Sequence, residues 1–366
     1  MNVMHLLTGG DIGGIESLCR EYADYSNNKN IFVMLKDICA DNAKHLLEHG
    51  HIVIQLGISK KNMIKGVKRI KSIIKEYKIE AIVTHHASPI LHILMQSVRI
   101  YNKKIKRISY AHGNALNMVR YGEKKGLRFR KKVLSWSLRK SDSVIAISDS
   151  VKESLVDYFK TPEKKIKVIY NGINISRFNL TKKGKNQKAH IIYVGRLVEG
   201  KGVQIILKAL SLLPKELAYH FTIVGDGEYK SILEELTSEY KLIDNVEFVG
   251  RKNNIEEYII DSDIFIHVPL FEEGFGITIV EAMAGGLICI CSRSGGIPEI
   301  IEDKVNGYLI QKNDSEMLAE RLEYVIKKQS SEELNNIIVN AKERAKKYDI
   351  TEFAKALDNH IGLINK

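Results

Sequence analysis

Apolar and polar residues form alternating short and long blocks along most of the chain. Short runs rich in Val, Ile, Tyr and Phe predict β-strands, and several longer stretches between them have the apolar spacing of amphipathic helices. In the first half the strand-like runs are MNVMHLL, NIFVML, HIVIQL, AIVTHH, RISYAHG, SVIAIS and IKVIYNG. In the second half they are HIIYVG, HFTIVG, VEFVG, DIFIHVP and LICICS. Strands that alternate with helices predict parallel, doubly wound α/β sheets.

The same pattern predicts two domains joined by a polar linker. The chain has 366 residues, which is enough for two separate cores. The lysine-rich stretch SRFNLTKKGKNQKAH interrupts the alternation, so we expect a linker at residues 176–190. The first domain would then span residues 1–175 and the second residues 191–348. Residues 349–366 have a helical pattern, and this helix would either complete the second domain or cross back to the first.

The composition indicates a globular protein of a reducing compartment. Hydrophobic residues make up 44% of the chain and charged residues 27%, which is ordinary for a globular protein. We find no apolar run long enough to span a bilayer, and the first residues lack the layout of a signal peptide. The four cysteines form no C-x-x-C pair. We therefore expect a cytoplasmic protein with reduced cysteines.

Basic residues are concentrated in the first half of the chain. Residues 1–180 carry a net charge of +17 and residues 181–366 one of −5. The densest stretch, residues 120–140, interleaves nine basic residues and one acid with Leu, Phe and Trp. This pattern favours a surface that lies peripherally on the anionic inner membrane, and a solvated helix face remains the alternative. No nucleic-acid motif accompanies the charge, so we expect no nucleic-acid partner.

Three glycine-rich turns follow predicted strands, which is where ligands of open α/β sheets bind. The first, TGGDIGGIES, contains Gly13 and Gly14 and can bring backbone N–H groups against an anion at a helix start. The second, YVGRLVEGKG, carries Arg196 and Lys201, whose positive charges suit a diphosphate. Glycine pairs and surface cations also occur without a ligand, so neither turn identifies a site by itself.

The third turn, FEEGFGITIVEAMAGG, combines two carboxylates with a helix start. The glycines on either side of Phe275 disfavour a helix, so we expect the helix to begin near Ile277 or Thr278. Glu273 would then lie in the loop, and Glu281 would lie about one turn into the helix. Two carboxylates beside free helix N–H groups can accept hydrogen bonds from the hydroxyls of a sugar.

The segment EGFGITIVE resembles the E-x7-E motif of retaining glycosyltransferases of family 4. Further parts of that family's pattern are similar to VGRLVEGKG, VGDGE, FVGR, NGINISRF and GGIPEII. The resemblance runs from Gly13 to about Gly307. It implies an α/β fold of two Rossmann-like domains, the GT-B arrangement, with a cleft between them.

The resemblance also implies roles for individual residues. Glu281 would bind the ribose hydroxyls of a nucleotide, and Glu273 would hold hydroxyls of the transferred sugar. Arg196 and Lys201 would neutralise the diphosphate and the charge of the leaving group. The other donor-binding residues that the family implies are Gly13, Gly14, Arg251, Gly276, Ile277 and Thr278.

Three histidines follow strands of the first domain. The resemblance implies that His112 contacts the donor sugar near the reacting carbon, which completes a catalytic set with Glu273, Arg196 and Lys201. His85 and His86 could line the acceptor side. For each histidine, a structural hydrogen bond at the end of a strand remains the alternative.

Asp261-Ser262-Asp263 needs a separate interpretation, because D-x-D is the metal signature of another glycosyltransferase class. Here it precedes the strand-like run IFIHV, where members of family 4 carry an acid. Two cations already serve the diphosphate. We therefore expect a structural role for both aspartates, no bound metal, and no cofactor besides the donor substrate.

The resemblance, together with these features, implies a retaining, metal-independent hexosyltransferase that uses a nucleotide-diphosphate sugar, with a UDP-sugar as the expected donor. The second domain would bind the donor, and the first would bind a lipid-linked or saccharide acceptor. The expected product is a bacterial surface polysaccharide such as lipopolysaccharide or capsule. A nucleotide-sugar epimerase of related architecture and a non-catalytic nucleotide-sugar-binding partner are the alternatives.

Overall fold

The computed structural model divides the chain into two compact units. One comprises residues 1–173 together with 350–366, and the other comprises residues 174–349. The structure describes residues 1–9, 14–35, 41–58, 62–85, 87–117, 126–179 and 188–364. Within the expected linker, residues 176–179 and 188–190 are described and belong to the second unit.

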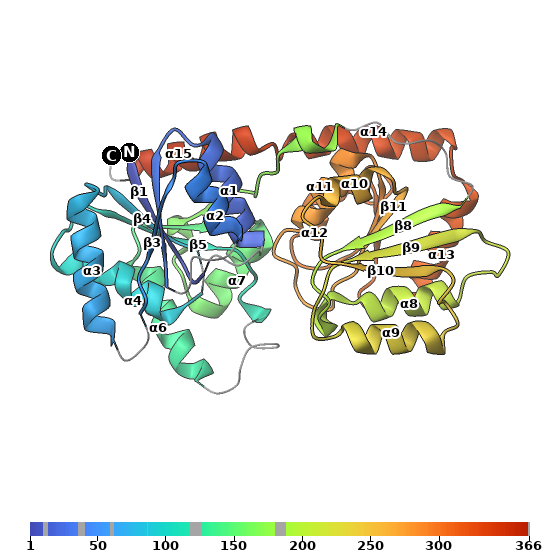
Figure 1. The fold of residues 1–366 in the computed structure, drawn as a ribbon, viewed down its shortest axis with the longest axis horizontal. Helices are drawn as coiled ribbons and strands as arrows, with labels where there is room; N and C mark the ends of the chain where they lie inside the picture. The colour runs from blue at the N-terminus through green and yellow to red at the C-terminus, as the bar shows by residue number, and fades with distance from the viewer. Residues whose placement is uncertain are drawn as a thin grey trace. The chain divides into compact units, whose positions relative to one another are not determined.

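The described part of the first unit is built on a seven-stranded sheet in the order β3-β2-β1-β4-β5-β6-β7 (Figure 1). Its strands are β1 (Asn2–Leu7), β2 (Lys29–Met34), β3 (Ile52–Gln55), β4 (Ala81–Thr84), β5 (Lys106–Ala111), β6 (Ser143–Ala146) and β7 (Ile166–Val168). All the paired strands run parallel. Their carboxyl ends therefore meet at one edge, as the alternation of strands and helices predicts.

Helices cover both faces of this sheet, which is why its strands are apolar at consecutive positions. The helices of the unit are α1 (Gly14–Tyr25), α2 (Asp41–Glu48), α3 (Met63–Glu76), α4 (Pro89–Ser97), α6 (Leu127–Lys140), α7 (Asp149–Phe159) and α15 (Ile350–Leu363). On β2, Ile31 and Val33 pack in one core with residues of α3 and α4. Phe32 and Met34 face the opposite way and pack with residues of α1 and α2.

The last helix, α15, belongs to the first unit and is anchored there by one carboxylate. Asp358 accepts hydrogen bonds from the Tyr22 hydroxyl at 2.5 Å, the Ser26 hydroxyl at 2.8 Å and the Asn28 side-chain amide at 2.8 Å. The backbone N–H of Asn27 donates a fourth at 2.8 Å. Of the two placements that the sequence leaves open, the structure therefore shows the helix on the first unit.

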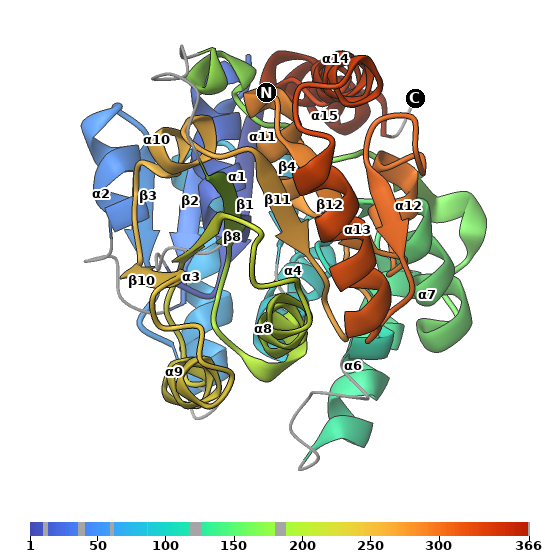
Figure 2. The same cartoon turned by 90° about the vertical axis from the view of Figure 1, so that its right-hand side faces the viewer.

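The described part of the second unit repeats the scheme with a six-stranded parallel sheet in the order β10-β9-β8-β11-β12-β13. Its strands are β8 (Ala189–Val194), β9 (Tyr219–Val224), β10 (Val246–Gly250), β11 (Ile264–His267), β12 (Ile288–Ser292) and β13 (Tyr308–Ile310). Its helices are α8 (Val203–Ser211), α9 (Lys230–Glu239), α10 (Ile255–Ile260), α11 (Ile277–Gly285), α12 (Ile297–Ile300), α13 (Ser315–Lys327) and α14 (Glu332–Lys346). Helices α8, α9 and α13 cover one face, and α10 and α11 cover the other (Figures 1 and 2).

Both units are thus Rossmann-like, as the sequence predicts. Among the described residues, no helix combines the length and the apolar character that crossing a membrane requires.

Candidate functional site

In the second unit, two neighbouring strands deliver the candidate residues to the carboxyl edge of the sheet. Strand β8 leads into the loop that carries Arg196 and Lys201, and β11 leads into the loop that carries Glu273. The two loops approach closely at Gly202, where an added Cβ would lie 2.0 Å from the carbonyl oxygen of Val268. Gly202 also has a φ of +76°, which a residue with a Cβ adopts at a cost. Glycine is therefore required for Lys201 to reach the end of β11.

Lys201 and Glu273 form an ion pair in this loop cluster. The ammonium Nζ of Lys201 lies 2.7 Å from Oε2 of Glu273, and the two side chains are only 16% and 14% exposed. Oε2 also accepts a hydrogen bond from Nε2 of buried His267 at 3.0 Å, while Oε1 accepts one from the backbone N–H of Gly274 at 3.2 Å. A carboxylate offers about four lone-pair positions, so about one is left on Oε1 for a further donor.

These contacts keep Glu273 ionised. Burial by itself raises the pKa of the carboxyl group, but the Lys201 ammonium and the His267 imidazole outweigh it and hold the pKa well below its usual range. Burial also lowers the pKa of His267, and Lys201 lowers it further, against the opposing effect of Glu273. His267 is therefore neutral at neutral pH and donates its Nε2 proton to Glu273.

The backbone around Glu273 is fixed by the loop that follows β12. The carbonyl oxygen of Glu273 accepts the N–H of Gly296 at 2.9 Å, and its own N–H points to Oγ of Ser294 at 3.4 Å. A Cβ on Gly295 would lie 2.0 Å from that carbonyl oxygen, and the residue has a φ of +53°. Beside it, Glu272 is ion-paired with Lys312. The carboxylate is thus positioned before any ligand arrives.

Helix α11 starts where the sequence predicts. Gly276 precedes it with a φ of +102°, and Ile277 and Thr278 are its first two residues. The N–H groups in the first turn of a helix have no partner within the helix, so they can donate to an anion. Glu281 lies in the second turn of the helix, and only 8% of this residue's surface is exposed. The carboxylate that the apolar pattern leaves unexplained is therefore buried near this helix start.

The two arginines of the predicted donor site are exposed at the same edge of the sheet. Arg196 follows β8, and among the described residues none forms an ion pair with its guanidinium. Its backbone carbonyl accepts the hydroxyl of buried Tyr193 at 3.0 Å, which fixes the loop. Arg251 directly follows β10. The roles expected of both arginines stay predictions.

Asp263 has a structural contact at the opposite end of β11. Its Oδ2 accepts the backbone N–H of His190 at 2.9 Å, and its own N–H donates to the His190 carbonyl at 2.8 Å. These bonds join the start of β11 to the start of β8. They support the structural role expected of the Asp261-Ser262-Asp263 segment.

In the first unit, two of the predicted histidines, buried His85 and half-buried His112, belong to a chain of imidazoles. His112 Nε2 lies 3.1 Å from His85 Nδ1, and His85 Nε2 lies 2.9 Å from His5 Nδ1. His5 Nε2 lies 3.0 Å from the side-chain oxygen of Asn30. Burial lowers the pKa of His5 to about 4, so this imidazole is neutral and donates to Asn30. His5 then accepts the Nε2 proton of His85.

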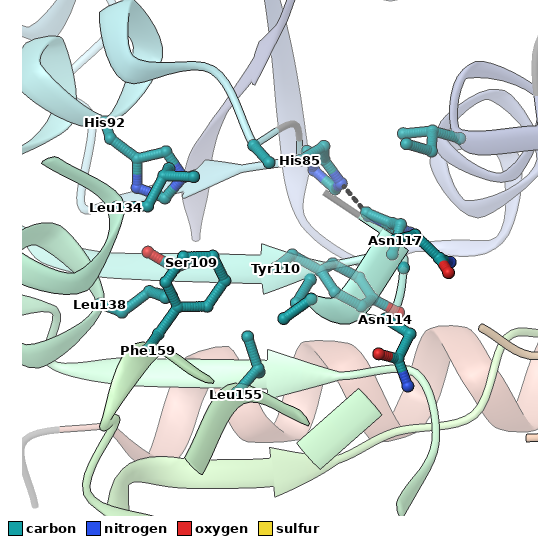
Figure 3. A pocket seen from close by; sticks show the side chains of 16 residues that line it. His85, His92, Ser109, Tyr110, Asn114, Asn117, Leu134, Leu138, Leu155 and Phe159 are labelled. Atoms are coloured by element: carbon teal, nitrogen blue, oxygen red, sulfur yellow. Dashed lines mark hydrogen bonds between the residues drawn. The ribbon is translucent and has the colours of Figure 1, made fainter. Parts of the chain in front are cut away.

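A cavity of about 270 Å³ lies beside these histidines (Figure 3). Its apolar lining comes from Leu134, Leu138, Leu155 and Phe159, and its polar lining includes His85, His112, Asn114 and Asn117. Tyr110 also lines it, and the hydroxyl of this residue is buried without a hydrogen-bond partner among the described residues. The cavity therefore combines an apolar wall with polar groups at the carboxyl ends of β4 and β5.

Several predicted residues lie outside the described residues, namely Gly13, His86 and residues 120–125 of the basic stretch. Gly14 is described and begins α1. Sequence reasoning missed His267, His5 and Tyr110. The sequence signal for His267 was a histidine in an otherwise apolar strand, six residues before Glu273.

Comparisons with known proteins cover both units. A family model for glycosyl transferases group 1 matches residues 176–344, and one for glycosyltransferase family 4 matches residues 12–177. An uncharacterized glycosyltransferase of Methanocaldococcus jannaschii is 30% identical over 330 residues, which cover 89% of this chain and 84% of that protein. The amylovoran biosynthesis glycosyltransferase AmsK of Erwinia amylovora is 34% identical over 167 residues, or 43% of this chain and 41% of that protein.

The fold is also that of a solved GT-B structure. The crystal structure of Anabaena HepE in complex with UDP and glucose matches with a TM-score of 0.86 and 20% sequence identity. The match covers 99% of this chain and 100% of that chain.

Proposed function

We propose, from the premise that this chain belongs to the group 1 glycosyltransferases of family 4 with the GT-B fold, that it is a retaining hexosyltransferase. The observation that carries the proposal is the Lys201–Glu273 pair beside the start of α11, with Glu281 buried in the second turn of that helix. It combines a cation for phosphate, a carboxylate for sugar hydroxyls and a second carboxylate for a ribose.

The proposed donor is a nucleotide-diphosphate sugar with UDP as the nucleotide. HepE, whose fold this chain shares, holds UDP and glucose in its crystal structure, which supports this choice. Lys201 has three donor protons, and Glu273 uses one of them. The remaining two can face a diphosphate together with the exposed Arg196 and the N–H groups that begin α11. Gly13, Gly14 and Arg251 complete the proposed donor contacts.

The main catalytic contribution would be stabilisation of the departing nucleoside diphosphate. Negative charge develops on the phosphate oxygen as the glycosidic bond breaks, and fixed cations and helix N–H groups stabilise that charge. Glu273 and His112 would hold and orient the sugar. The acceptor hydroxyl would attack from the face that the leaving group vacates. Because Glu273 is committed to Lys201 and His267, we assign it no role as a covalent nucleophile.

The proposed acceptor site is the cavity of the first unit. Its polar side offers the groups that recognise a saccharide, and its apolar wall fits the hydrocarbon part of a lipid-linked acceptor. The relationship to an amylovoran biosynthesis enzyme supports a role in bacterial surface polysaccharide synthesis. Lipopolysaccharide and capsule are both compatible with this chemistry.

We further propose that α6 attaches the protein to the inner face of the cell membrane. Phe129 and Trp136 on this helix are 62% and 41% exposed, and Arg128, Lys132 and Lys140 are exposed around them. Two other cations of α6 have partners within the unit, because Arg130 donates to the carbonyl of Ala87 and Lys131 lies over the ring of Tyr158. The remaining exposed cations and aromatic rings suit an anionic lipid surface.

Catalysis would need no metal ion, because Lys201 and Arg196 neutralise the diphosphate and Asp263 is bonded to the backbone. Transfer should therefore persist when divalent ions are chelated, and an absolute requirement for Mg²⁺ or Mn²⁺ would contradict this.

The test of the proposed function is a donor screen with purified protein, short saccharide acceptors and lipid-linked acceptors. We expect release of nucleotide only with an acceptor present, and a product with the anomeric configuration of the donor. An inverted product would overturn the retaining mechanism. Conversion of the nucleotide sugar without an acceptor would instead indicate an epimerase, and binding without turnover a non-catalytic partner.

A further inference from the structure

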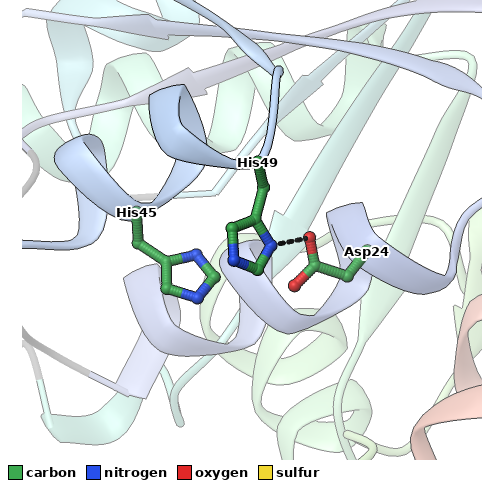
Figure 4. Close-up of side chains that lie close together, drawn as sticks. All are labelled: Asp24, His45 and His49. Atoms are coloured by element: carbon green, nitrogen blue, oxygen red, sulfur yellow. Dashed lines mark hydrogen bonds and ion pairs between the residues drawn. The ribbon is translucent and has the colours of Figure 1, made fainter.

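In the first unit, helix α1 and the segment formed by α2 and the turn after it bring two histidines and one aspartate together (Figure 4). His45 lies on α2, and His49 lies in the turn that directly follows it, where its backbone N–H donates to the carbonyl of His45 at 3.0 Å. The ring centroids of the two histidines are 3.8 Å from each other. Asp24 lies near the end of α1. One ligand atom from each of these three side chains lies within 4.8 Å of the other two.

We propose that Asp24, His45 and His49 bind Zn²⁺ or a similar divalent transition metal. Two imidazoles and one carboxylate are ligands that Zn²⁺ prefers, and paired histidines at i and i+4 share one face of a helix. Ligand atoms about 2 Å from a tetrahedral ion lie roughly 3.3 Å apart, so each pair of ligand atoms needs to close by at most about 1.5 Å. Rotation about side-chain bonds supplies such a movement.

The contacts of these three side chains are compatible with metal binding. Nδ1 of His45 is buried and has no hydrogen-bond partner among the described residues. Nδ1 of His49 lies 3.0 Å from Oδ1 of Asp24, which is the distance of a hydrogen bond. A metal ion bound by both atoms would take the place of the proton between them.

A fourth group orients the carboxylate. Nε2 of His51 lies 3.2 Å from Oδ1 of Asp24, from the segment that follows α2. A carboxylate that ligates a metal is commonly held by such an outer hydrogen bond, so we assign His51 the role of orienting Asp24. Arg20 opposes the site electrostatically, and its own side chain is paired with Glu21 at 3.6 Å.

The topology separates this site from the proposed chemistry. Gly14 begins α1 at the carboxyl edge of the sheet, and Asp24 lies ten residues further along the same helix, about 15 Å away. The ion would therefore join α1 to α2 and stabilise the first unit. It would take no part in glycosyl transfer, so this inference stands independently of the proposed function.

The test uses the full chain without a polyhistidine tag. Zn²⁺ binding is measured by calorimetry, and the coordination number is read from the visible spectrum of bound Co²⁺. We expect one ion per chain, a four-coordinate Co²⁺ spectrum, and a melting temperature that rises with Zn²⁺. Absence of binding, or a weakly held six-coordinate ion, would overturn the proposal.

Matched variants locate the ion. His45→Asn and His49→Asn should each weaken Zn²⁺ binding at least tenfold, His51→Asn should weaken it less, and Arg20→Gln should tighten it. The control is His220→Asn, since His220 is also paired with a carboxylate, Glu247 at 3.4 Å, but lies in the second unit. Equal binding by His45→Asn, His49→Asn and the unsubstituted chain would refute the assignment.

Discussion

Lys201 and Glu273 show how a single ion pair can prepare a site for a charged ligand. A buried carboxylate is costly unless a cation compensates it, and the Lys201 ammonium does so at 2.7 Å. The pair holds the ammonium group at the edge of the sheet, and the hydrogen bond to Glu273 uses only one of its three N–H donors. Removing either partner therefore affects both the ligand and the protein.

We expect Arg196→Ala to reduce turnover much more than stability, and Lys201→Gln to reduce both, because it leaves the buried Glu273 carboxylate without its cation. Each removes a positive charge that faces the leaving group, which is worth on the order of 2–4 kcal/mol of barrier, or about 30- to 1000-fold in rate. The glutamine can still donate to Glu273, and Arg196 is exposed, so both variants should fold. Turnover and thermal unfolding are measured together.

Lys208→Ala is the control for these two variants, because Lys208 is an exposed cation on α8 of the same unit. It should leave turnover unchanged. Turnover near that of the unsubstituted protein in both Lys201→Gln and Arg196→Ala would mean that the diphosphate binds elsewhere.

The two glutamates of the motif should differ in what they bind. Glu281→Ala should weaken both the free nucleotide and the sugar nucleotide, since this carboxylate is assigned to the ribose. Glu273→Gln should weaken the sugar nucleotide and spare the free nucleotide, since its partner is the sugar. Calorimetric titrations with both ligands test the division, and equal losses for both ligands in both variants would reject it.

His5 should make the stability of the first unit depend on pH. Burial lowers the pKa of this imidazole to about 4, below its ordinary value of 6.5. Between these values the unfolded chain binds a proton that the folded chain does not, so stability falls as the pH drops from about 6.5 to about 4. The free energy lost through one such group is about 1.4 kcal/mol per pH unit.

Chemical denaturation at a series of pH values measures this effect. His5→Gln should show a shallower fall than the unsubstituted protein, because glutamine does not titrate. The same slope in both proteins would show that His5 is not the group responsible.

At the scale of residues, the sequence identified charged candidates but not their partners. Glu273, Lys201 and Arg196 are candidates because they lie in or beside glycine-rich turns that follow apolar strands, and their roles stay predictions. The pairing of Lys201 with Glu273 was not predicted, because the two are far apart in sequence and meet only through the order of the strands. His267 and His5 were missed because a histidine inside an apolar strand has the same pattern as core.

Helix α15 shows what a single side chain contributes to the attachment of an element. The Asp358 carboxylate accepts four hydrogen bonds from residues 22–28. Lys106 and Ser143 add contacts from the sheet to the end of the same helix. An amphipathic helix with these partners is part of the core of the unit.

We expect Asp358→Ala to destabilise the protein by about 2–4 kcal/mol. The substitution leaves several donors without their charged acceptor, including the largely buried hydroxyl of Tyr22. Thermal and chemical unfolding measure the loss, with Glu352→Ala as the control, because Glu352 is an exposed acid on the same helix. A loss no greater than that of Glu352→Ala would show that the helix is held by its apolar face alone.

At the level of elements, the sequence predicted the alternation of strands and helices and a helix that starts near Ile277 or Thr278, and α11 begins at Ile277. Periodicity identifies an apolar face, and glycines mark where a helix cannot continue. The periodicity could not show where the last helix packs. An apolar stripe indicates that a helix is buried, but it does not indicate which sheet the helix packs against. That information lies in polar contacts such as those of Asp358.

For the whole molecule, we expect the uneven charge to appear as binding to anionic vesicles. The full chain should co-sediment with vesicles that contain acidic lipid and only weakly with neutral ones. Each cation near an acidic surface contributes about 1 kcal/mol, and this part weakens as salt rises. Replacing four exposed cations of α6 with glutamate should release the protein. These cations are Arg128, Lys132, Arg139 and Lys140.

The matched control makes the same charge change on α3. Four of its five exposed cations are replaced, namely Lys65, Lys68, Arg69 and Lys75, and the fifth, Lys71, which lies over the ring of Tyr101, is kept. If the α3 variant retains binding and the α6 variant loses it, the contact is local to α6. Equal loss in both would show an effect of net charge alone, and unchanged binding in the α6 variant would leave its cations as a solvated helix face.

Because residues 350–366 return to the first unit, the second unit is an insertion within the first. A fragment that stops at residue 173 therefore lacks the helix that carries Asp358, whereas residues 174–349 form one continuous segment. The first unit is best produced by fusing residue 173 to residue 350 through a short spacer. For the same reason, proteolysis must cut the chain at two places to separate the units. A circular permutant with new termini at one of the two connections between the units would have the original termini joined within the first unit.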